Sequence, residues 1–325
     1  MGIPGVALVV PAYRTRDVVG ELIDSVLAQS RADWELVVVD DASPDQLHEV
    51  VTPYLTDPRI RLVRLPDNRG VSAARNEGAA RTSAELVAFL DSDDLVEPGF
   101  VERVAAAMET PSVGIAGVIP AVTGPDGEPS TLPGTDARPP SSPDDTEAWL
   151  LHLLRHPFHF RGTTVRRTVW DKAGGFAEDL WLGEDLELWV RVVLTGCSVR
   201  VVEQPCYVHR LAGESITRQS DRTVERSLAH LAALDRIEAQ LPATPEHAAA
   251  LAAARRIPRS LEGAGRFRRA ARAGDGPAAR HHARTLARLD PGPRTRLLRA
   301  VSLVPSPVLR GVYRAGRRLR GLPPA

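Results

Sequence analysis

Apolar runs and helical patterns alternate along the first 90 residues of the chain. Residues 6–10 form a short apolar run of β-favouring residues. After this run, apolar residues recur at helical spacing: Val18, Leu22, Ile23, Val26 and Leu27. The same order continues in strands expected at 36–39, 60–65 and 86–90 and in a helix expected over about 71–81. This alternation predicts an α/β fold with a mostly parallel central sheet and helices on both faces.

A further helix is expected to follow the second strand. Ser43 reads as its N-cap, Pro44 as its first helical residue and Gln46 as the partner in a capping box. The sequence therefore predicts that this helix begins at about residue 44.

The pattern changes twice further along the chain. Residues 123–145 are rich in Pro, Gly, Ser and Asp, which predicts a long loop that is either functional or without order. From residue 221 onward Ala, Arg and Leu dominate, and apolar residues again recur at helical spacing: Val224, Leu228, Leu231, Leu234, Ile237 and Leu241. We therefore expect two domains, a catalytic one at 1–216 and a helical C-terminal extension at 217–325.

Acidic and basic residues are distributed unevenly between these two parts. The 325 residues include 41 Lys plus Arg and 41 Asp plus Glu, so the formal net charge is zero. Residues 1–216 hold 19 basic and 33 acidic side chains, whereas residues 217–325 hold 22 basic and 8 acidic ones. Such asymmetry is typical of a segment that has a charged partner.

The end of the chain has the pattern of a basic interfacial helix, with arginines and apolar residues on different faces between 308 and 319. Peripheral contact with an anionic membrane through residues 294–320 and docking against an acidic protein surface are both open. Nucleic acid is disfavoured, since few aromatic residues lie among the arginines.

The lack of a recognisable targeting segment predicts a cytoplasmic protein, which could also touch the inner face of the membrane. No apolar run approaches the roughly 18 residues that a membrane span needs. The N-terminus lacks the charged segment of a signal peptide. Cys197 and Cys206 have no zinc-ligand spacing and are expected to be reduced thiols.

Acidic clusters follow two of the predicted strands. Asp91 and Asp93 come directly after the strand at 86–90, where two carboxylates can hold Mg²⁺ or Mn²⁺. An acidic turn or a helix cap is the alternative.

Asp41 follows another strand and could accept the imide N–H of a pyrimidine base, and Tyr13 could stack on that base. The alternatives are a carboxylate that only forms a turn and a tyrosine of the core. In open α/β sheets, ligands bind at this edge.

A third acidic pair, Glu184 and Asp185, lies at the start of a predicted amphipathic helix. An aspartate there could accept the proton of a hydroxyl group. The alternative is a carboxylate that only stabilises the positive end of the helix dipole.

Together these residues resemble the inverting nucleotide-sugar glycosyltransferases of family 2, which have the GT-A fold. The resemblance covers about residues 3–211 and rests on six ordered blocks. The blocks are Val9-Val10-Pro11-Ala12-Tyr13, Val39-Asp40-Asp41-Ala42-Ser43, Asn68 to Gly78, Phe89-Leu90-Asp91-Ser92-Asp93-Asp94, Lys172-Ala173-Gly174-Gly175-Phe176, and Gly183-Glu184-Asp185 with Trp189 and Arg191.

The resemblance implies a role for each matching residue. Asp185 is the implied catalytic base. Glu184 and Trp181 lie on the acceptor side. Asp93 is the implied metal ligand, with Asp91 beside it and His209 as a further candidate whose alternative is a structural role. Residues implied in donor binding are Pro11, Tyr13, Asp41, Arg75, Asn76, Asp91 and Ser92.

Two positions depart from the family pattern. Arg14 stands where an Asn is common, and Ala42 stands where a Gly is usual. Ala42 is acceptable only if its turn does not require positive φ. The departures leave the base of the donor, usually uracil, open.

The implied function is metal-dependent, inverting transfer of a sugar from a nucleoside diphosphate sugar, with UDP favoured, to an acceptor hydroxyl. Mg²⁺ or Mn²⁺ is the implied cofactor. Bacterial cell-envelope polysaccharide, glycolipid and secondary-metabolite glycosylation are the implied settings, and a lipid-linked acceptor is one option. A sugar-phosphate nucleotidyltransferase is the first alternative, but it would carry a Gly-rich phosphate loop where Tyr13 and Arg14 stand. A non-catalytic nucleotide-sugar-binding module is the second, and it would have lost a catalytic carboxylate.

Overall fold

The computed structural model describes residues 5–124, 126–131, 137–156, 161–211, 223–289, 298–300, 302–303 and 308. The chain divides into two compact units, one of residues Met1–Thr217 with Gln240–Pro242 and one of residues Arg218–Ala239 with Ala243–Ala325. The assignment of catalysis to 1–216 and of a separate role to 217–325 stays a prediction.

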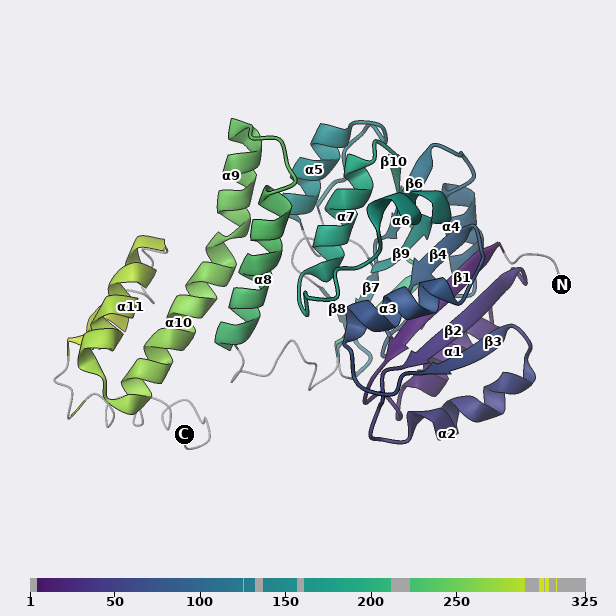
Figure 1. Ribbon diagram of the computed structural model, residues 1–325, viewed down its shortest axis with the longest axis horizontal. Coiled ribbons are helices and arrows are strands. Elements are labelled where there is room, and N and C mark those ends of the chain that lie inside the picture. The colour runs from purple at the N-terminus through teal and green to yellow at the C-terminus, as the bar shows by residue number, and fades with distance from the viewer. Residues whose placement is uncertain are drawn as a thin grey trace. The chain divides into compact units, whose positions relative to one another are not determined.

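A seven-stranded sheet forms the centre of the first unit (Figure 1). Its strands, in spatial order, are β10 (Ser198–Val202), β6 (Val113–Val118), β9 (Arg161–Arg166), β4 (Leu86–Phe89), β1 (Val6–Ala12), β2 (Trp34–Asp40) and β3 (Ile60–Arg64). Neighbouring strands run parallel except where β9 pairs with β4 and β6. The prediction of an α/β fold with a mostly parallel sheet is confirmed.

The main core lies on one face of this sheet. Alternate residues of β1, namely Val6, Leu8 and Val10, pack there with apolar residues of three helices. The helices are α1 (Val19–Leu27), α2 (Leu47–Val51) and α4 (Phe100–Ala107). A 3₁₀ helix, η1 (Thr52–Thr56), continues α2.

Helix α3 (Val71–Ala80) packs on the opposite face, against β1 and β2. Gly78 makes this close approach possible, since a Cβ atom there would lie 2.4 Å from Val9 Cγ1 and 3.1 Å from Val39 Cγ2. Two more helices, α6 (Arg167–Ala173) and α7 (Glu184–Leu194), belong to this unit. An aromatic cluster links α6 and α7 to β4 through Phe89, Trp170, Phe176 and Trp189.

A smaller, four-stranded sheet completes the first unit. Its strands, in spatial order, are β5 (Leu95–Val96), β11 (Tyr207–Arg210), β7 (Ala121–Thr123) and β8 (Pro129–Ser130). Thus β8 lies inside the stretch 123–145 that the sequence predicts as a loop, and α5 (Thr146–Arg155) follows that stretch. Residues 125 and 132–136 lie outside the described part of the chain.

Four helices build the described part of the second unit: α8 (Thr223–Glu238), α9 (Pro245–Ala254), α10 (Arg256–Ala273) and α11 (Gly276–Leu289). Phe267 and Ala271 of α10 pack against Ala279, Ala283 and Leu286 of α11. The predicted helical extension is confirmed. The interfacial helix expected at 308–319 lies outside the described residues except for Val308. None of the described helices is long and apolar enough to cross a membrane.

The predicted helix start at Ser43 is wrong. Helix α2 begins at Leu47, and Gln46 before it has a left-handed backbone with φ of 60°. The hydroxyl of Ser43 instead accepts a hydrogen bond from the backbone N–H of Arg14 at 2.7 Å. The Ser43 side chain, which could have capped a helix, therefore links the segment after β1 to the loop after β2 through this hydrogen bond.

Candidate functional site

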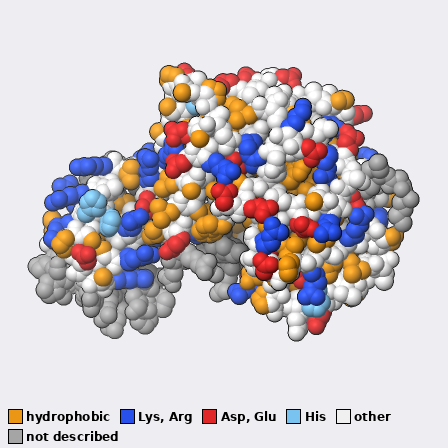
Figure 2. Space-filling model, in the orientation of Figure 1, with side chains coloured by type: hydrophobic (Ala, Val, Ile, Leu, Met, Phe, Trp, Pro, Cys, Tyr) orange, Lys and Arg blue, Asp and Glu red, His pale blue; other side chains and the backbone are white. Residues whose placement is uncertain are grey.

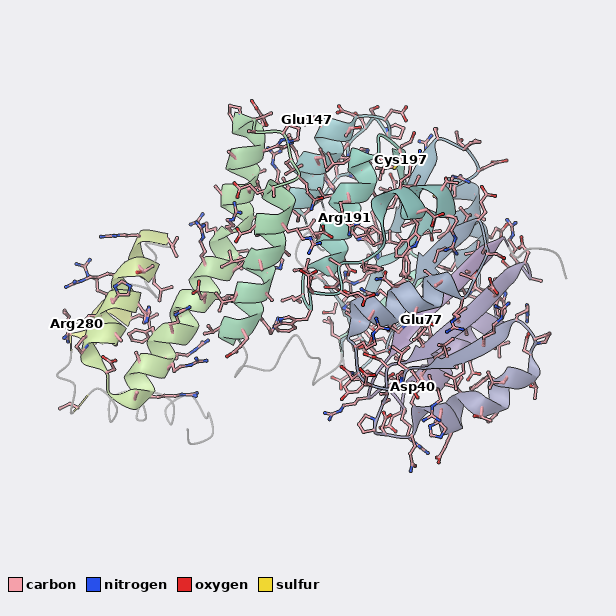
Figure 3. The ribbon with its side chains drawn as sticks, in the orientation of Figure 1. Asp40, Glu77, Glu147, Arg191, Cys197 and Arg280 are labelled. Carbon is pink, nitrogen blue, oxygen red and sulfur yellow. The ribbon has the colours of Figure 1, made fainter. Side chains whose placement is uncertain are left out.

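Polar side chains collect where β1, β2 and β4 end. Ala12 of β1 pairs with Asp40 of β2, and Val9 of β1 pairs with Phe89 of β4, so the segments that follow these three strands are neighbours. Asp40 marks this edge of the sheet in Figure 3. The strand ends therefore lie side by side as the sequence analysis expects, and binding of a ligand at this edge stays a prediction.

Arg75 of α3 lies at the centre of the site and binds three carboxylates. Its Nη1 donates to Glu184 Oε1 at 3.0 Å and to Asp185 Oδ1 at 2.7 Å. Its Nη2 donates to Asp91 Oδ1 at 2.9 Å. The side chain of Arg75 is only 7% exposed, whereas those of Asp91 and Asp185 are 37% and 41% exposed. One buried guanidinium therefore joins the D-x-D segment to the acidic start of α7.

Within this cluster the pKa of Asp91 is lowered and that of Glu184 is raised. Burial raises the pKa of Asp91, but the positive charges of Arg75 and Arg161 outweigh it, so this pKa lies below its ordinary value. Burial and the negative charge of Asp185 raise the pKa of Glu184 to about 7, against the opposing charge of Arg75. Glu184 is thus the buried member of the acidic pair, and Asp185 is the one that faces solvent.

Asp93 forms no ion pair with an Arg or Lys of the described residues, although the charge of His209 acts to lower its pKa. Burial, together with the charges of Asp94 and Asp91, raises its pKa to about 6. A carboxylate in this position fits a hard divalent cation, which would remove that repulsion. Among the described residues, however, no three Asp, Glu, His or Cys side chains are arranged to hold a metal ion. Asp91, Asp93 and His209 therefore form no three-ligand site in the described chain, and a cation at Asp93 would take its other ligands from water or substrate.

Asp94, which the sequence analysis gave no role, is a fully buried anchor of the site. It accepts hydrogen bonds from Tyr207 Oη at 2.8 Å and from the backbone N–H of Arg210 at 2.9 Å. Tyr207 Oη also accepts from the backbone N–H of Asp91 at 3.1 Å. This network fixes the D-x-D segment onto β11. The only signals in the sequence were the three aspartates within 91–94 and the distant segment Tyr207-Val208-His209-Arg210.

His209 belongs to the same network. Its Nδ1 lies 2.9 Å from Asp94 Oδ2. In the neutral ring with Nδ1 protonated, Nε2 keeps a free lone pair, which is the usual arrangement of a metal-binding histidine held by a carboxylate. Both the structural role and the ligand role suggested for His209 therefore remain predictions.

Asp41 is buried at the end of β2, with both carboxylate oxygens engaged. Oδ1 accepts from the backbone N–H of Arg69, and Oδ2 accepts from that of Gly70, each at 2.8 Å. Asp41 therefore shapes the loop before α3. A contact with the donor base would use the remaining lone pairs of these oxygens.

The other residues predicted on the donor side have different surroundings. Pro11 and Ser92 are buried, and Tyr13 is partly exposed with the Arg14 guanidinium 5.3 Å from the centre of its ring. The Asn76 amide binds the backbone of Phe176, accepting at 2.8 Å and donating at 2.9 Å. Asn76 thus holds the turn that follows α6, and its role in donor binding stays a prediction.

Trp181 lies in the segment just before α7 and is 45% exposed. Large apolar side chains are usually buried in a folded unit, so an exposed indole two residues before the α7 N-cap is available to a ligand. This placement is compatible with the acceptor side that the resemblance implies.

The segments that follow β1 and β2 contain three non-glycine residues with positive φ: Arg14 at 58°, Ala42 at 53° and Gln46 at 60°. The turn at Ala42 therefore does require the left-handed region, contrary to the condition under which alanine would be acceptable. Such a conformation costs a non-glycine residue about 1 kcal/mol.

Replacing Ala42 by Gly is expected to raise the free energy of unfolding by about 1 kcal/mol, because glycine adopts positive φ without a steric penalty. Denaturant unfolding of the two proteins measures the difference. Ala106, exposed in α4, is the matched control: Ala106→Gly is expected to lower stability by about the same amount. A loss of stability in Ala42→Gly would contradict the strain argument.

Comparison with known proteins identifies relatives of this chain. The family described as Glycosyl transferase family 2 matches residues 7–174. The succinoglycan biosynthesis protein ExoO of Rhizobium meliloti is 32% identical over 221 residues, which are 66% of this chain and 63% of ExoO. The putative teichuronic acid biosynthesis glycosyltransferase TuaG of Bacillus subtilis is 41% identical over 92 residues, 28% of this chain and 36% of TuaG. The chain thus spans less than two thirds of the length of these relatives.

Solved structures show the same fold. TarS of S. aureus matches with a TM-score of 0.62 and 18% identity, over 95% of this chain and 55% of TarS. The mannosyltransferase PcManGT of Pyrobaculum calidifontis matches with a TM-score of 0.58 and 21% identity, over 96% of this chain and 87% of PcManGT. These matches confirm the predicted GT-A type fold. Since the family match covers more than half of the 325 residues and includes the strand ends that carry the site, the chain belongs to glycosyl transferase family 2.

Proposed function

We propose that this protein transfers a sugar from a nucleoside diphosphate sugar to an acceptor hydroxyl, with inversion at the anomeric carbon. The observation that carries the proposal is the bridge made by Arg75, which places Asp91 of the D-x-D segment and Asp185 of α7 on one guanidinium. Arg75 thus holds Asp91, the proposed donor-side carboxylate, close to Asp185, the carboxylate that faces solvent.

Asp185 is the proposed base. One of its oxygens is held by Arg75, and the exposed carboxylate can accept the proton of an acceptor hydroxyl as that oxygen attacks the sugar. A single displacement of this kind inverts the anomeric carbon. Trp181, exposed before α7, offers an apolar surface on which an acceptor sugar can stack.

Asp93 is the residue that we assign to hold Mg²⁺ or Mn²⁺. The chemistry that such an ion supplies is neutralisation of the charge that develops on the departing diphosphate. The raised pKa of Asp93, about 6, and the absence of an ion pair between Asp93 and any Arg or Lys of the described chain support this assignment. PcManGT is described in complex with GDP-Man and Mn²⁺, which supports it independently.

A UDP sugar is the proposed donor. Asp41 lies at the end of β2, where a carboxylate can accept the imide N–H of uracil, and TarS is described in complex with UDP-GlcNAc. ExoO is named for succinoglycan biosynthesis, which supports a bacterial polysaccharide as the setting for the acceptor. The family match goes against the nucleotidyltransferase alternative.

A panel of nucleotide sugars tests the proposal without knowledge of the acceptor. Each donor is added with Mn²⁺ or Mg²⁺, and both hydrolysis of the donor and the shift in melting temperature are measured. We expect at least one UDP sugar to be hydrolysed and to stabilise the protein only when the cation is present. If no nucleotide sugar binds or reacts, the proposed function is wrong.

Peripheral contact with an anionic membrane through residues 294–320 is a second proposal, with docking against an acidic protein surface as its alternative. Helices α10 and α11 contain nine Arg and a single Glu, and Figure 2 shows Arg side chains gathered over this part of the chain. Arg280 points away from α11 in Figure 3. Flotation with anionic vesicles, with and without residues 294–325, tests the contact that the sequence predicts for 294–320. Equal flotation of the two proteins would rule out that segment.

A further inference from the structure

We propose that Arg75 is a positioning residue that sets the geometry between Asp91 and Asp185, so that the donor side and the base share one fixed arrangement. The sequence resemblance suggested only that Arg75 binds the donor. This inference rests on the proposed function, in which Asp185 is the base. It concerns what holds that base in place.

The three carboxylates take three of the five N–H groups of Arg75, while the buried Nε has no hydrogen-bond partner in the described chain. Nη1 has two hydrogens, and both are used, at 3.0 Å on Glu184 and 2.7 Å on Asp185. Nη2 uses one of its two hydrogens on Asp91 at 2.9 Å. The guanidinium therefore uses most of its N–H groups in hydrogen bonds to the protein itself, which is typical of a residue that organises other side chains.

The oxygens that Arg75 binds also suggest positioning. Asp91 and Asp185 each give Oδ1 to Arg75, and within the described chain no hydrogen bond uses Oδ2 of either residue. Both side chains are more than a third exposed, so a ligand can reach each of them. Arg75 thus holds one side of each carboxylate and leaves the opposite side for chemistry.

Arg75 is itself firmly held. Its guanidinium carbon lies 5.0 Å from the centre of the Phe176 ring, and Glu184, whose side chain is 9% exposed, binds it from the start of α7. One turn further along α3, Gly78 lets the helix approach Val9 of β1. The position of Arg75 is therefore set by how closely α3 packs on the sheet.

The Arg75→Lys variant distinguishes a positioning role of Arg75 from a role in binding the sugar donor. It keeps the positive charge but cannot bind three carboxylates with a planar fork. We expect Arg75→Lys to lower kcat about a hundredfold, since misplacing a reacting group by about 1 Å costs that much, while the KM of the donor changes less than about threefold. Arg81→Lys is the matched control, because Arg81 ends the same helix and pairs with Glu77 outside the site. Its kcat is expected to match wild type.

A kcat of Arg75→Lys within twofold of wild type would overturn the inference, as would a loss confined to the KM of the donor. The donor-induced shift in melting temperature shows whether the variant is folded. If it is not, Gly78→Ala provides the test, since its Cβ forces α3 away from Val9 without changing any charge. We expect its kcat to fall about tenfold, whereas Gly20→Ala in α1 has ordinary contacts and serves as its control. An unchanged kcat in Gly78→Ala would also overturn the inference.

The outcome separates this inference from the proposed function. If wild type neither binds nor hydrolyses any nucleotide sugar, the proposed function fails, and the role of Arg75 fails with it. If wild type is active and Arg75→Lys is equally active, only the role of Arg75 is overturned.

Discussion

Replacing Asp185 by Asn is expected to lower kcat about a thousandfold, because a positioned general base contributes about two to four powers of ten to a rate. The amide keeps the size of the side chain and can still accept a hydrogen bond from Arg75, but it cannot take a proton. Binding of the donor is expected to remain within about threefold of wild type, since the interaction that is lost belongs to the transition state. Turnover and the donor-induced shift in melting temperature are measured side by side.

Asp171→Asn is the matched control, because Asp171 is an exposed aspartate of α6. Its turnover is expected to equal that of wild type. Near-normal turnover in Asp185→Asn would mean that another group removes the proton. Glu184 would then be the next candidate, since it is the neighbouring carboxylate and its pKa is raised to about 7.

Replacing Asp93 by Asn is expected to abolish the stabilisation that Mn²⁺ and donor give together, and to weaken cation-dependent donor binding about a hundredfold. The same change is expected to raise the stability of the cation-free protein at neutral pH by about 1 kcal/mol. The reason for this gain is that burial and the charges of Asp94 and Asp91 oppose the ionised form of Asp93. Thermal unfolding with and without Mn²⁺ measures both effects.

Asp94→Asn, at the position after Asp93, is expected to have the opposite effect on stability. Asp94 is fully buried and accepts from Tyr207, His209 and the backbone of Arg210, so its loss is expected to cost about 2 kcal/mol of stability. If Asp93→Asn behaved like Asp94→Asn, Asp93 would be a structural residue. Retention of the Mn²⁺ effect in Asp93→Asn would likewise exclude it as the metal ligand.

The fold could be predicted largely from the sequence because its elements have strong local patterns. The run at 6–10 became β1, and the pattern at 71–81 became α3 at nearly the same bounds. The helix start at Ser43 was predicted wrongly, because a side chain that can cap a helix can also bind a distant backbone. Ser43 binds Arg14, which lies 29 residues away. Local propensity does not decide between these partners.

The candidate site could be predicted only as a set of separate residues. Asp91, Asp93 and Asp185 each belong to a short motif that can be read on its own. Their connection through Arg75 could not be predicted, since Arg75 and Asp185 are 110 residues apart in the chain. Asp94 was overlooked for the same reason, because its partners Tyr207 and His209 are 113 and 115 residues away.

The sequence by itself determined the alternation of strands and helices, the six motif blocks and the separation of acidic from basic residues. These features depend on residue type and spacing along the chain. Only the tertiary structure decided which carboxylates meet, which of them is anchored and which faces solvent. The physical reason is that the order of strands in the sheet and the close packing of α3 at Gly78 bring these side chains together. That convergence depends on long-range packing, which no local pattern specifies.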